Sequence, residues 1–237
     1  MTEQHQSDNP AVADSSTGSA KPSSVIDYTP LPLERLIGMA DLLLIGTVEA
    51  ITDERLRIRI DASLQQRPPA RESIVIKRER RPVIFAPRQV PYMPGQQFMF
   101  FLLQADKSTD SQEWSILGYP IAGELPIEEG FVYFDSYDID GFDFQEYEVH
   151  GVIRPMQRFD LDNFMDAIRK YRNCFSWSQV ERMKNKRLIK RWVPVRVCDE
   201  KMLQNYRDRS QIHAYLARET VKQVPPKAIY ENSLESK

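Results

Sequence analysis

The sequence from Pro32 to Ile51, PLERLIGMADLLLIGTVEAI, decides the fold class of this 237-residue chain. Proline suits a helix start, because its missing N–H would be unpaired there. The residues after it place apolar side chains at helical spacing, namely Leu33, Leu36, Ile37 and Ala40. From Leu42 onward the pattern changes to an apolar run, which is typical of a buried strand. A short helix that leads straight into such a strand predicts a β-barrel with a helix packed at its entrance.

Strand patterns continue along the chain as far as residue 153. Between Leu56 and Leu64, apolar residues alternate with charged or polar ones, so we expect a half-buried strand with arginines on its outer face. The uninterrupted FMFFLL run within Gln97–Gln104 predicts a strand that is buried on both faces. Shorter strands are predicted at Ser73–Lys77, Trp114–Leu117, Glu124–Ile127, Phe131–Phe134 and Tyr147–Ile153.

Helical patterns follow the strands. Asp160 is a good N-cap for a helix with one apolar stripe, made by Leu161, Phe164, Ile168 and Tyr171. A second helix is predicted from Trp177 to Trp192, where Ser178 and Glu181 have capping-box spacing. A third, from about Glu200 to Lys222, ends before two prolines that cannot continue it.

These elements predict a mainly β, α+β fold. We expect a small closed or partly open β-barrel with an N-terminal helix and a C-terminal helical extension. The predicted organisation is a disordered tail at 1–30, a barrel domain with flanking helices at 31–175 and a basic helical extension at 176–237. The tail prediction rests on a polar composition that offers almost no apolar burial to offset the entropy of ordering.

Charge is divided unevenly along the chain, although the formal net charge is only −2. Residues 1–150 hold 13 basic and 24 acidic side chains and are net −11, whereas residues 151–237 hold 19 and 10 and are net +9. No Lys or Arg occurs between Lys107 and Arg154, a stretch with eleven acidic residues. Such a division either ties the two parts together or presents surfaces of opposite charge to partners.

The cysteine content and the start of the chain predict a cytoplasmic protein. The first residues are polar and acidic, and no apolar run of a secretory signal precedes Leu31. Cys174 and Cys198 are the only cysteines, too few for a disulfide framework, so we expect free thiols. The longest apolar run, Phe98–Leu103, is far shorter than the roughly 20 residues of a membrane-spanning helix.

Four segments carry a resemblance to known proteins: LERLIGMADLLLIGTV, PGQQFMFFL, LGYPIAGELPIEEGFVYF and FDLDNFMDAIRKY. Over residues 31–172 they resemble a group of small bacterial β-barrel proteins. The barrel is similar to the oligonucleotide/oligosaccharide-binding fold and, more remotely, to the netrin-like domain of tissue inhibitors of metalloproteinases. Those inhibitors act through a cysteine at the mature N-terminus. This chain has none in the equivalent region, so the resemblance implies a fold and no site.

The acidic segment Asp135–Asp143 is a candidate calcium loop. Its oxygen-bearing residues lie two apart ahead of a glycine, as in an EF-hand. With Gly141 at the glycine position, however, Tyr147 stands where a bidentate glutamate belongs. We therefore favour a solvated acidic turn, and we keep three candidate metal ligands, Asp138, Asp140 and Asp143.

Patterns of a catalytic site do not occur in the sequence. His150 and His213 are the only histidines outside the tail, and neither lies in sequence beside a nucleophile or a carboxylate partner. We therefore expect no enzymatic activity and no cofactor. A hydrolase whose site has no recognised motif stays open as a second alternative.

The segment from Tyr171 to Trp192 carries the partner prediction. It interleaves aromatic with basic residues, a combination that stacks on bases and neutralises phosphates. Because the acidic barrel would repel a phosphate backbone, nucleic-acid binding is the alternative. The main expectation is a non-enzymatic protein-binding or adaptor module that uses its acidic barrel loops and its basic extension. The expected partner-binding residues are Arg182, Lys186, Arg187, Lys190 and Trp192.

Overall fold

The computed structural model describes residues 31–64, 71–77, 92–104, 113–118, 122–135, 139–184 and 187–224, except for the side chains of 182–184 and 187–190. The predicted disordered tail at 1–30 lies outside these ranges. The described elements are α1 (Leu33–Met39), β1 (Leu42–Ile51), β2 (Arg55–Ser63), β3 (Ser73–Lys77), β4 (Gln97–Gln104), β5 (Glu113–Ile116), β6 (Glu124–Glu128), β7 (Phe131–Phe134), β8 (Gln145–Val149), β9 (Val152–Asp160), α3 (Leu161–Cys174), β10 (Phe175–Lys184), β11 (Arg187–Arg196), α4 (Glu200–Arg207) and α5 (Gln211–Val221).

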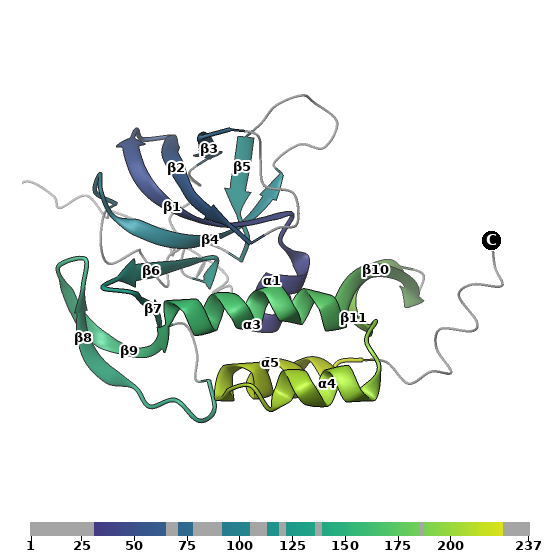
Figure 1. The fold of residues 1–237 in the computed structure, drawn as a ribbon. Helices are drawn as coiled ribbons and strands as arrows, with labels where there is room; N and C mark the ends of the chain where they lie inside the picture. The colour runs from purple at the N-terminus through teal and green to yellow at the C-terminus, as the bar shows by residue number, and fades with distance from the viewer. Residues whose placement is uncertain are drawn as a thin grey trace, which may run out of the picture.

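Five strands close into a barrel, seen at the top of Figure 1. Their order is β1-β2-β3-β5-β4, and β4 pairs in turn with β1. All neighbouring strands are antiparallel except β3 and β5, which are parallel. The predicted fold class, a mainly β chain with a small closed barrel and flanking helices, is therefore confirmed.

Alternating side chains give the barrel an inner and an outer apolar layer. In β4, Phe98 and Phe100 lie inside the barrel, whereas Met99 and Phe101 belong to the cluster shared with the helices. The strand is thus buried on both faces, as predicted. In β2, Leu56 and Ile58 are buried, and the intervening arginines are exposed. The predicted cationic outer face of this strand is confirmed.

Beyond the barrel, the sheet continues through β6, β7 and β9 to β8. Two hairpins in this part turn through residue pairs with positive φ, Glu129–Gly130 and His150–Gly151. Such two-residue turns match the right-handed twist of the flanking strands. The second turn falls inside the strand predicted at Tyr147–Ile153, so that prediction is wrong: the segment reverses direction and belongs to two strands.

The described helices lie on one side of the barrel, and α3 lies between the barrel and the α4–α5 pair (Figure 1). Asp160 caps α3 by accepting a hydrogen bond from the Asn163 N–H, as predicted. Leu36 of α1, Phe164 of α3 and Leu216 of α5 belong to one buried cluster with the outer face of β4. The C-terminal helices therefore share the core of the barrel domain.

The helix predicted from Trp177 to Trp192 is wrong. The chain forms an antiparallel hairpin of β10 and β11 there, and this hairpin is separate from the nine-stranded sheet. The segment predicted as a helix contains the β-branched residues Val180 and Ile189, a residue type that packs well in strands. The hairpin begins directly after α3, and its second strand returns to the point where the first one left.

The free-thiol prediction is also wrong, because Cys174 and Cys198 form a disulfide across the base of this hairpin. Two residues 24 positions apart in the sequence come within a Cα–Cα distance of 4.5 Å because the hairpin reverses the chain. The third predicted helix is divided in two. It stops at Arg207, and a second helix starts after Ser210, whose backbone is extended.

Candidate functional site

Four of the five residues predicted to bind a partner lie on the strands of the β10–β11 hairpin. The register pairs Arg182 with Ile189 and Lys190 with Glu181, and it pairs Arg187 with Lys184. Alternation along the strands assigns positions 182 and 187 to one face and positions 190 and 192 to the other. Trp192 is half-buried and pairs with Gln179. Lys186 lies outside the described residues.

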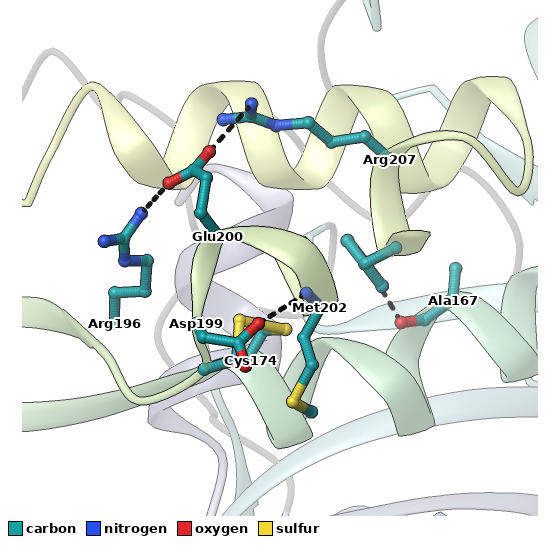
Figure 2. The surroundings of a disulfide bond; sticks show 9 residues. Ala167, Cys174, Arg196, Asp199, Glu200, Met202 and Arg207 are labelled. Carbon is teal, nitrogen blue, oxygen red and sulfur yellow. Dashed lines mark hydrogen bonds and ion pairs between the residues drawn. A yellow bond between two sulfur atoms is a disulfide. The ribbon is translucent and has the colours of Figure 1, made fainter. Parts of the chain in front are cut away.

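The base of the hairpin is fastened to the helices around it (Figure 2). The disulfide links the last residue of α3 to Cys198, two residues before α4. Beside it, Arg196 Nη1 lies 2.6 Å from Glu200 Oε2. Asp199 caps α4 by accepting a hydrogen bond of 2.7 Å from the Met202 N–H. The start of β10 and the end of β11 are therefore both attached to the neighbouring helices.

A buried hydrogen-bond network also holds β10 against three helices. Trp177 Nε1 donates to Tyr171 Oη over 2.9 Å, and the same oxygen lies 2.9 Å from Thr220 Oγ1 on α5. The Thr220 hydroxyl donates to the Leu216 carbonyl over 2.7 Å. The Trp177 ring lies against Gly38 of α1, where a Cβ atom would overlap it. The network therefore joins α1, α3, β10 and α5.

The aromatic residues of the predicted nucleic-acid segment are mostly used inside the molecule. Tyr171 and Phe175 are buried, and their ring centroids lie 5.0 Å apart. Trp177 is half-buried and takes part in the hydrogen-bond network with Tyr171. The fourth aromatic residue, Trp192, is half-buried as well. Base stacking needs an accessible ring face. The segment therefore offers a nucleic acid its basic residues and little aromatic surface.

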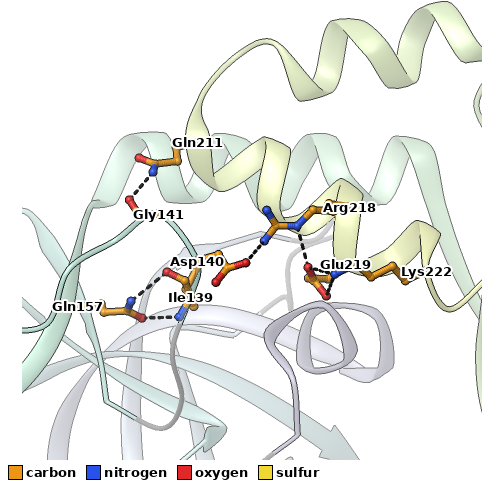
Figure 3. Close-up of polar contacts among 8 residues, drawn as sticks. All are labelled: Ile139, Asp140, Gly141, Gln157, Gln211, Arg218, Glu219 and Lys222. Carbon is orange, nitrogen blue, oxygen red and sulfur yellow. Dashed lines mark hydrogen bonds and ion pairs between the residues drawn. The ribbon is translucent and has the colours of Figure 1, made fainter.

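The acidic loop before β8 is attached to the C-terminal helices (Figure 3). Asp140 Oδ2 lies 3.0 Å from Arg218 Nη2 of α5, and the Gly141 carbonyl accepts a hydrogen bond from the Gln211 side chain. Buried Gln157 of β9 accepts a bond of 2.9 Å from the Ile139 N–H and donates one of 3.0 Å to its carbonyl. Here the acidic and basic parts of the chain are tied together, one of the two outcomes that the charge division indicated.

Of the candidate calcium ligands, the structure therefore pairs Asp140 with a guanidinium group. Asp143 is exposed, and Asp138 lies outside the described residues. Within the described ranges, no group of three or more His, Cys, Asp or Glu side chains is arranged to hold a metal ion. Calcium binding by this loop stays a prediction.

One Ser-His-Asp cluster bears on the hydrolase alternative. His213 Nδ1 lies 2.8 Å from Ser210 Oγ, and its Nε2 lies 3.4 Å from Asp166 Oδ2. The imidazole is completely buried, and this burial lowers the pKa of His213. Burial acts to raise the pKa of Asp166, but hydrogen bonding and charge from Lys170, with the charge of Arg209, lower it overall. The carboxylate is therefore already paired, and the serine stands at the start of α5 as its N-cap residue.

A buried carboxylate that the sequence analysis did not single out lies at the same junction. Glu34 is 1% exposed, and its Oε1 accepts a hydrogen bond of 2.5 Å from Gln223 Nε2. Gln223 Oε1 accepts in turn from Arg35 Nε over 3.0 Å. Oε2 of Glu34 has no hydrogen-bond partner within the described part of the chain. Burial raises the pKa of Glu34. A glutamate in the first turn of a helix is expected to be exposed, so nothing in the neighbouring sequence indicates that Glu34 is buried.

Comparisons with known proteins do not assign the chain to a family, because no protein-family model, curated protein or solved structure matches it.

None of the helices in the described ranges has both the length and the apolar character needed to cross a bilayer.

Proposed function

We propose that this protein is a non-enzymatic protein-binding or adaptor module whose β10–β11 hairpin contacts an acidic partner. The observation that carries the proposal is the contrast between the two ends of the hairpin. Its base is fixed by the Cys174–Cys198 disulfide and by Trp177, whereas its outer half extends beyond the end of α3 (Figure 1). An isolated two-stranded ribbon has marginal stability in water, and contact with another surface stabilises it.

Charge supports an acidic partner. From Phe175 to Arg196 the chain carries seven basic residues and one acidic residue. Opposite potentials steer two proteins together and favour complementary partners, and the effect weakens as salt screens it. The burial of Tyr171 and Phe175 and the use of Trp177 in the internal hydrogen-bond network favour protein over nucleic acid, because stacking on bases would use those rings.

The barrel belongs, in this proposal, to the oligonucleotide/oligosaccharide-binding type. Its closed circuit of five strands supports the assignment, since that fold is a five-stranded Greek-key barrel. The cytoplasmic location is proposed on the sequence pattern alone. The disulfide weighs against it, because disulfides persist mainly in oxidising compartments.

A charge-reversal experiment tests the hairpin. The triple variant Lys186→Glu, Arg187→Glu, Lys190→Glu should keep the melting temperature of the wild type and lose capture of protein partners. A matched control changes Lys77, Arg169 and Lys201 to Glu, because these exposed residues lie outside the hairpin and carry the same total charge. Wild-type capture should weaken with added salt, and the control should behave as wild type.

Three results would count against the proposal. Equal capture by both variants would place the interface elsewhere, and failure of the hairpin variant to fold would make these residues structural. Loss of wild-type capture after nuclease treatment, together with a high 260/280 nm absorbance ratio of the purified protein, would favour nucleic-acid binding.

For the hydrolase alternative, Ser210→Ala should leave any esterase signal of the preparation unchanged, since His213 and Asp166 are engaged in structural contacts.

A further inference from the structure

Strand β8 ends the nine-stranded sheet, and one of its edges carries no neighbouring strand among the described elements. The five barrel strands have partners on both sides because the barrel is closed, and β6, β7 and β9 each lie between two strands of the sheet. An exposed edge presents unpaired N–H and C=O groups that can pair with another chain. Native edges are often protected by charged side chains, above all lysine, by proline or by a bulge. The sequence of β8, QEYEV, contains neither lysine nor proline, and its charged residues are the two glutamates Glu146 and Glu148.

The hairpin register identifies the residues whose backbone faces this edge. Val149 pairs with Val152 across the two-residue turn, and Tyr147 pairs with Arg154. In such a hairpin, the pair next to the turn is hydrogen-bonded, and bonded pairs then alternate with non-bonded ones. The N–H and C=O groups of Tyr147 and Val149 therefore point to β9. Those of Glu146 and Glu148 point to the free edge.

The side chains of these two glutamates make the edge acidic. Both are exposed, and neither has a side-chain hydrogen bond or an ion pair within the described part of the chain. Asp143 adds a third exposed carboxylate just before the strand. Two exposed apolar side chains lie close by in the sheet, Ile153 at 66% exposure opposite Glu148, and Phe144 at 42% before β8.

We propose that β8 binds an extended segment of another protein by strand addition, and that this segment carries Lys or Arg at alternate positions. Each such residue would stand beside Glu146 or Glu148, and opposite charges on neighbouring strands stabilise the pairing. Phe144 and Ile153 add apolar contact on the same side. The surface lies at the opposite end of α3 from the β10–β11 hairpin (Figure 1), so the inference goes beyond the proposed function and stands or falls separately.

A second copy of this chain fits the edge poorly. An antiparallel pair of two β8 strands uses the outward-facing residues of both, which are Glu146 and Glu148 in each copy. In any antiparallel register where an outward-facing β8 residue of one copy lies opposite one of the other copy, a glutamate therefore faces a glutamate. Like charges directly opposite one another destabilise a strand pair. Charge therefore selects a basic partner over self-pairing.

The test uses the full chain, labelled with ¹⁵N, and a capped peptide of alternating Lys and Val residues as the probe. We expect the amides of Glu146 and Glu148 to shift and to gain protection from hydrogen exchange. A peptide of the same composition with its Lys and Val residues in two blocks, and a Glu-Val alternating peptide, serve as the comparison probes. Neither should protect these amides.

Two variants separate the backbone and charge contributions. Glu146→Pro removes an N–H that faces the free edge and leaves the ladder to β9 intact, so it should abolish binding of the probe. Glu146→Gln with Glu148→Gln keeps the backbone and should weaken binding about five- to tenfold, because two opposite-charge pairs are lost. The control pair Asp53→Lys and Glu72→Lys, at exposed positions away from β8, should bind as wild type.

Equal protection by the block peptide would overturn the proposal, since general charge attraction would then explain binding. Absence of protection at Glu146 and Glu148 with every probe would do the same. Sedimentation of the chain without peptide provides an independent check: a dimer that Glu146→Pro converts to a monomer would show that a second copy occupies the edge. If the variant with Glu146→Gln and Glu148→Gln binds the probe as tightly as wild type, the two carboxylates do not select a basic partner, and the proposed partner is wrong.

Discussion

Removing the Cys174–Cys198 disulfide should strongly destabilise the protein. The bond closes a loop with a sequence separation of 24 that contains the whole β10–β11 hairpin. For a loop of this length, the restriction of the unfolded chain contributes about 3.5 kcal/mol. For a chain of this size, such a loss lowers the melting temperature by roughly 10 °C. Both cysteines are buried in the main apolar cluster, so the released ends also lose a fixed position in the core.

The assay compares one protein in two redox states. Wild type is melted with and without a phosphine reductant, and its thiols are counted by alkylation and mass measurement after unfolding. The double variant Cys174→Ala, Cys198→Ala is the control, because it has no bond to reduce. It should melt near the reduced wild type and show no response to the reductant.

Two results would refute the reasoning. Two alkylated thiols in unreduced, freshly purified wild type would show that the bond does not form. A melting temperature that reduction leaves unchanged, in a protein without free thiols beforehand, would show that the cross-link contributes nothing to stability. The same thiol count on protein taken directly from the source cells tests the proposed cytoplasmic location, where a reducing environment predicts two free thiols.

Three further perturbations test the core, the buried carboxylate and the hairpin anchor. Ile58→Ala should lower the free energy of unfolding in urea by about 2–5 kcal/mol, because Ile58 is completely buried in the barrel. Arg57→Ala should lower it by less than about 0.5 kcal/mol, because the ion pair of Arg57 with Glu49 is exposed. Similar losses from the two variants would contradict the assignment of strand faces. Burial raises the pKa of Glu34 above its ordinary 4.5, so the stability linked to its proton is complete below pH 4.5 and is lost as pH rises through the raised pKa. Glu34→Gln should therefore be more stable than wild type at pH 7, by about 1–3 kcal/mol, with a smaller difference at pH 4, and an equal difference at both values would contradict the linkage. Gly38→Ala should displace the Trp177 ring and shift its fluorescence, while an unchanged spectrum would show that the ring does not lie on Gly38.

Two of the elements that the sequence predicts correctly have a burial pattern with a single period. In β2, alternation alone distinguishes Leu56 and Ile58 from the arginines between them. In α3, the stripe through Phe164, Ile168 and Tyr171 and the cap at Asp160 agree with one another. Such patterns predict structure because each residue's environment follows from its neighbours along the chain.

The candidate site is less predictable, because its residues satisfy two patterns at once. Val180, Met183 and Leu188 suit one side of a helix, and the same segment pairs as a hairpin. The choice rests on contacts between distant parts of the chain, such as the Trp177 ring on Gly38 and the bond between Cys174 and Cys198. Tertiary contacts of this kind outweigh helix propensity, which is worth only a fraction of a kcal/mol for most residues.

The sequence by itself determined the barrel, its entrance helix, the double burial of β4 and the separation of charge, since periodicity and composition are properties of neighbouring residues. Tertiary structure decided which charges meet, which aromatic rings are buried and which strand ends the nine-stranded sheet. Asp140 and Arg218 are 78 positions apart, and their ion pair exists because the loop before β8 packs on α5. The exposure of the β8 edge depends on the order of nine strands. Both are relations among distant segments, which the folded chain establishes through burial of a shared core.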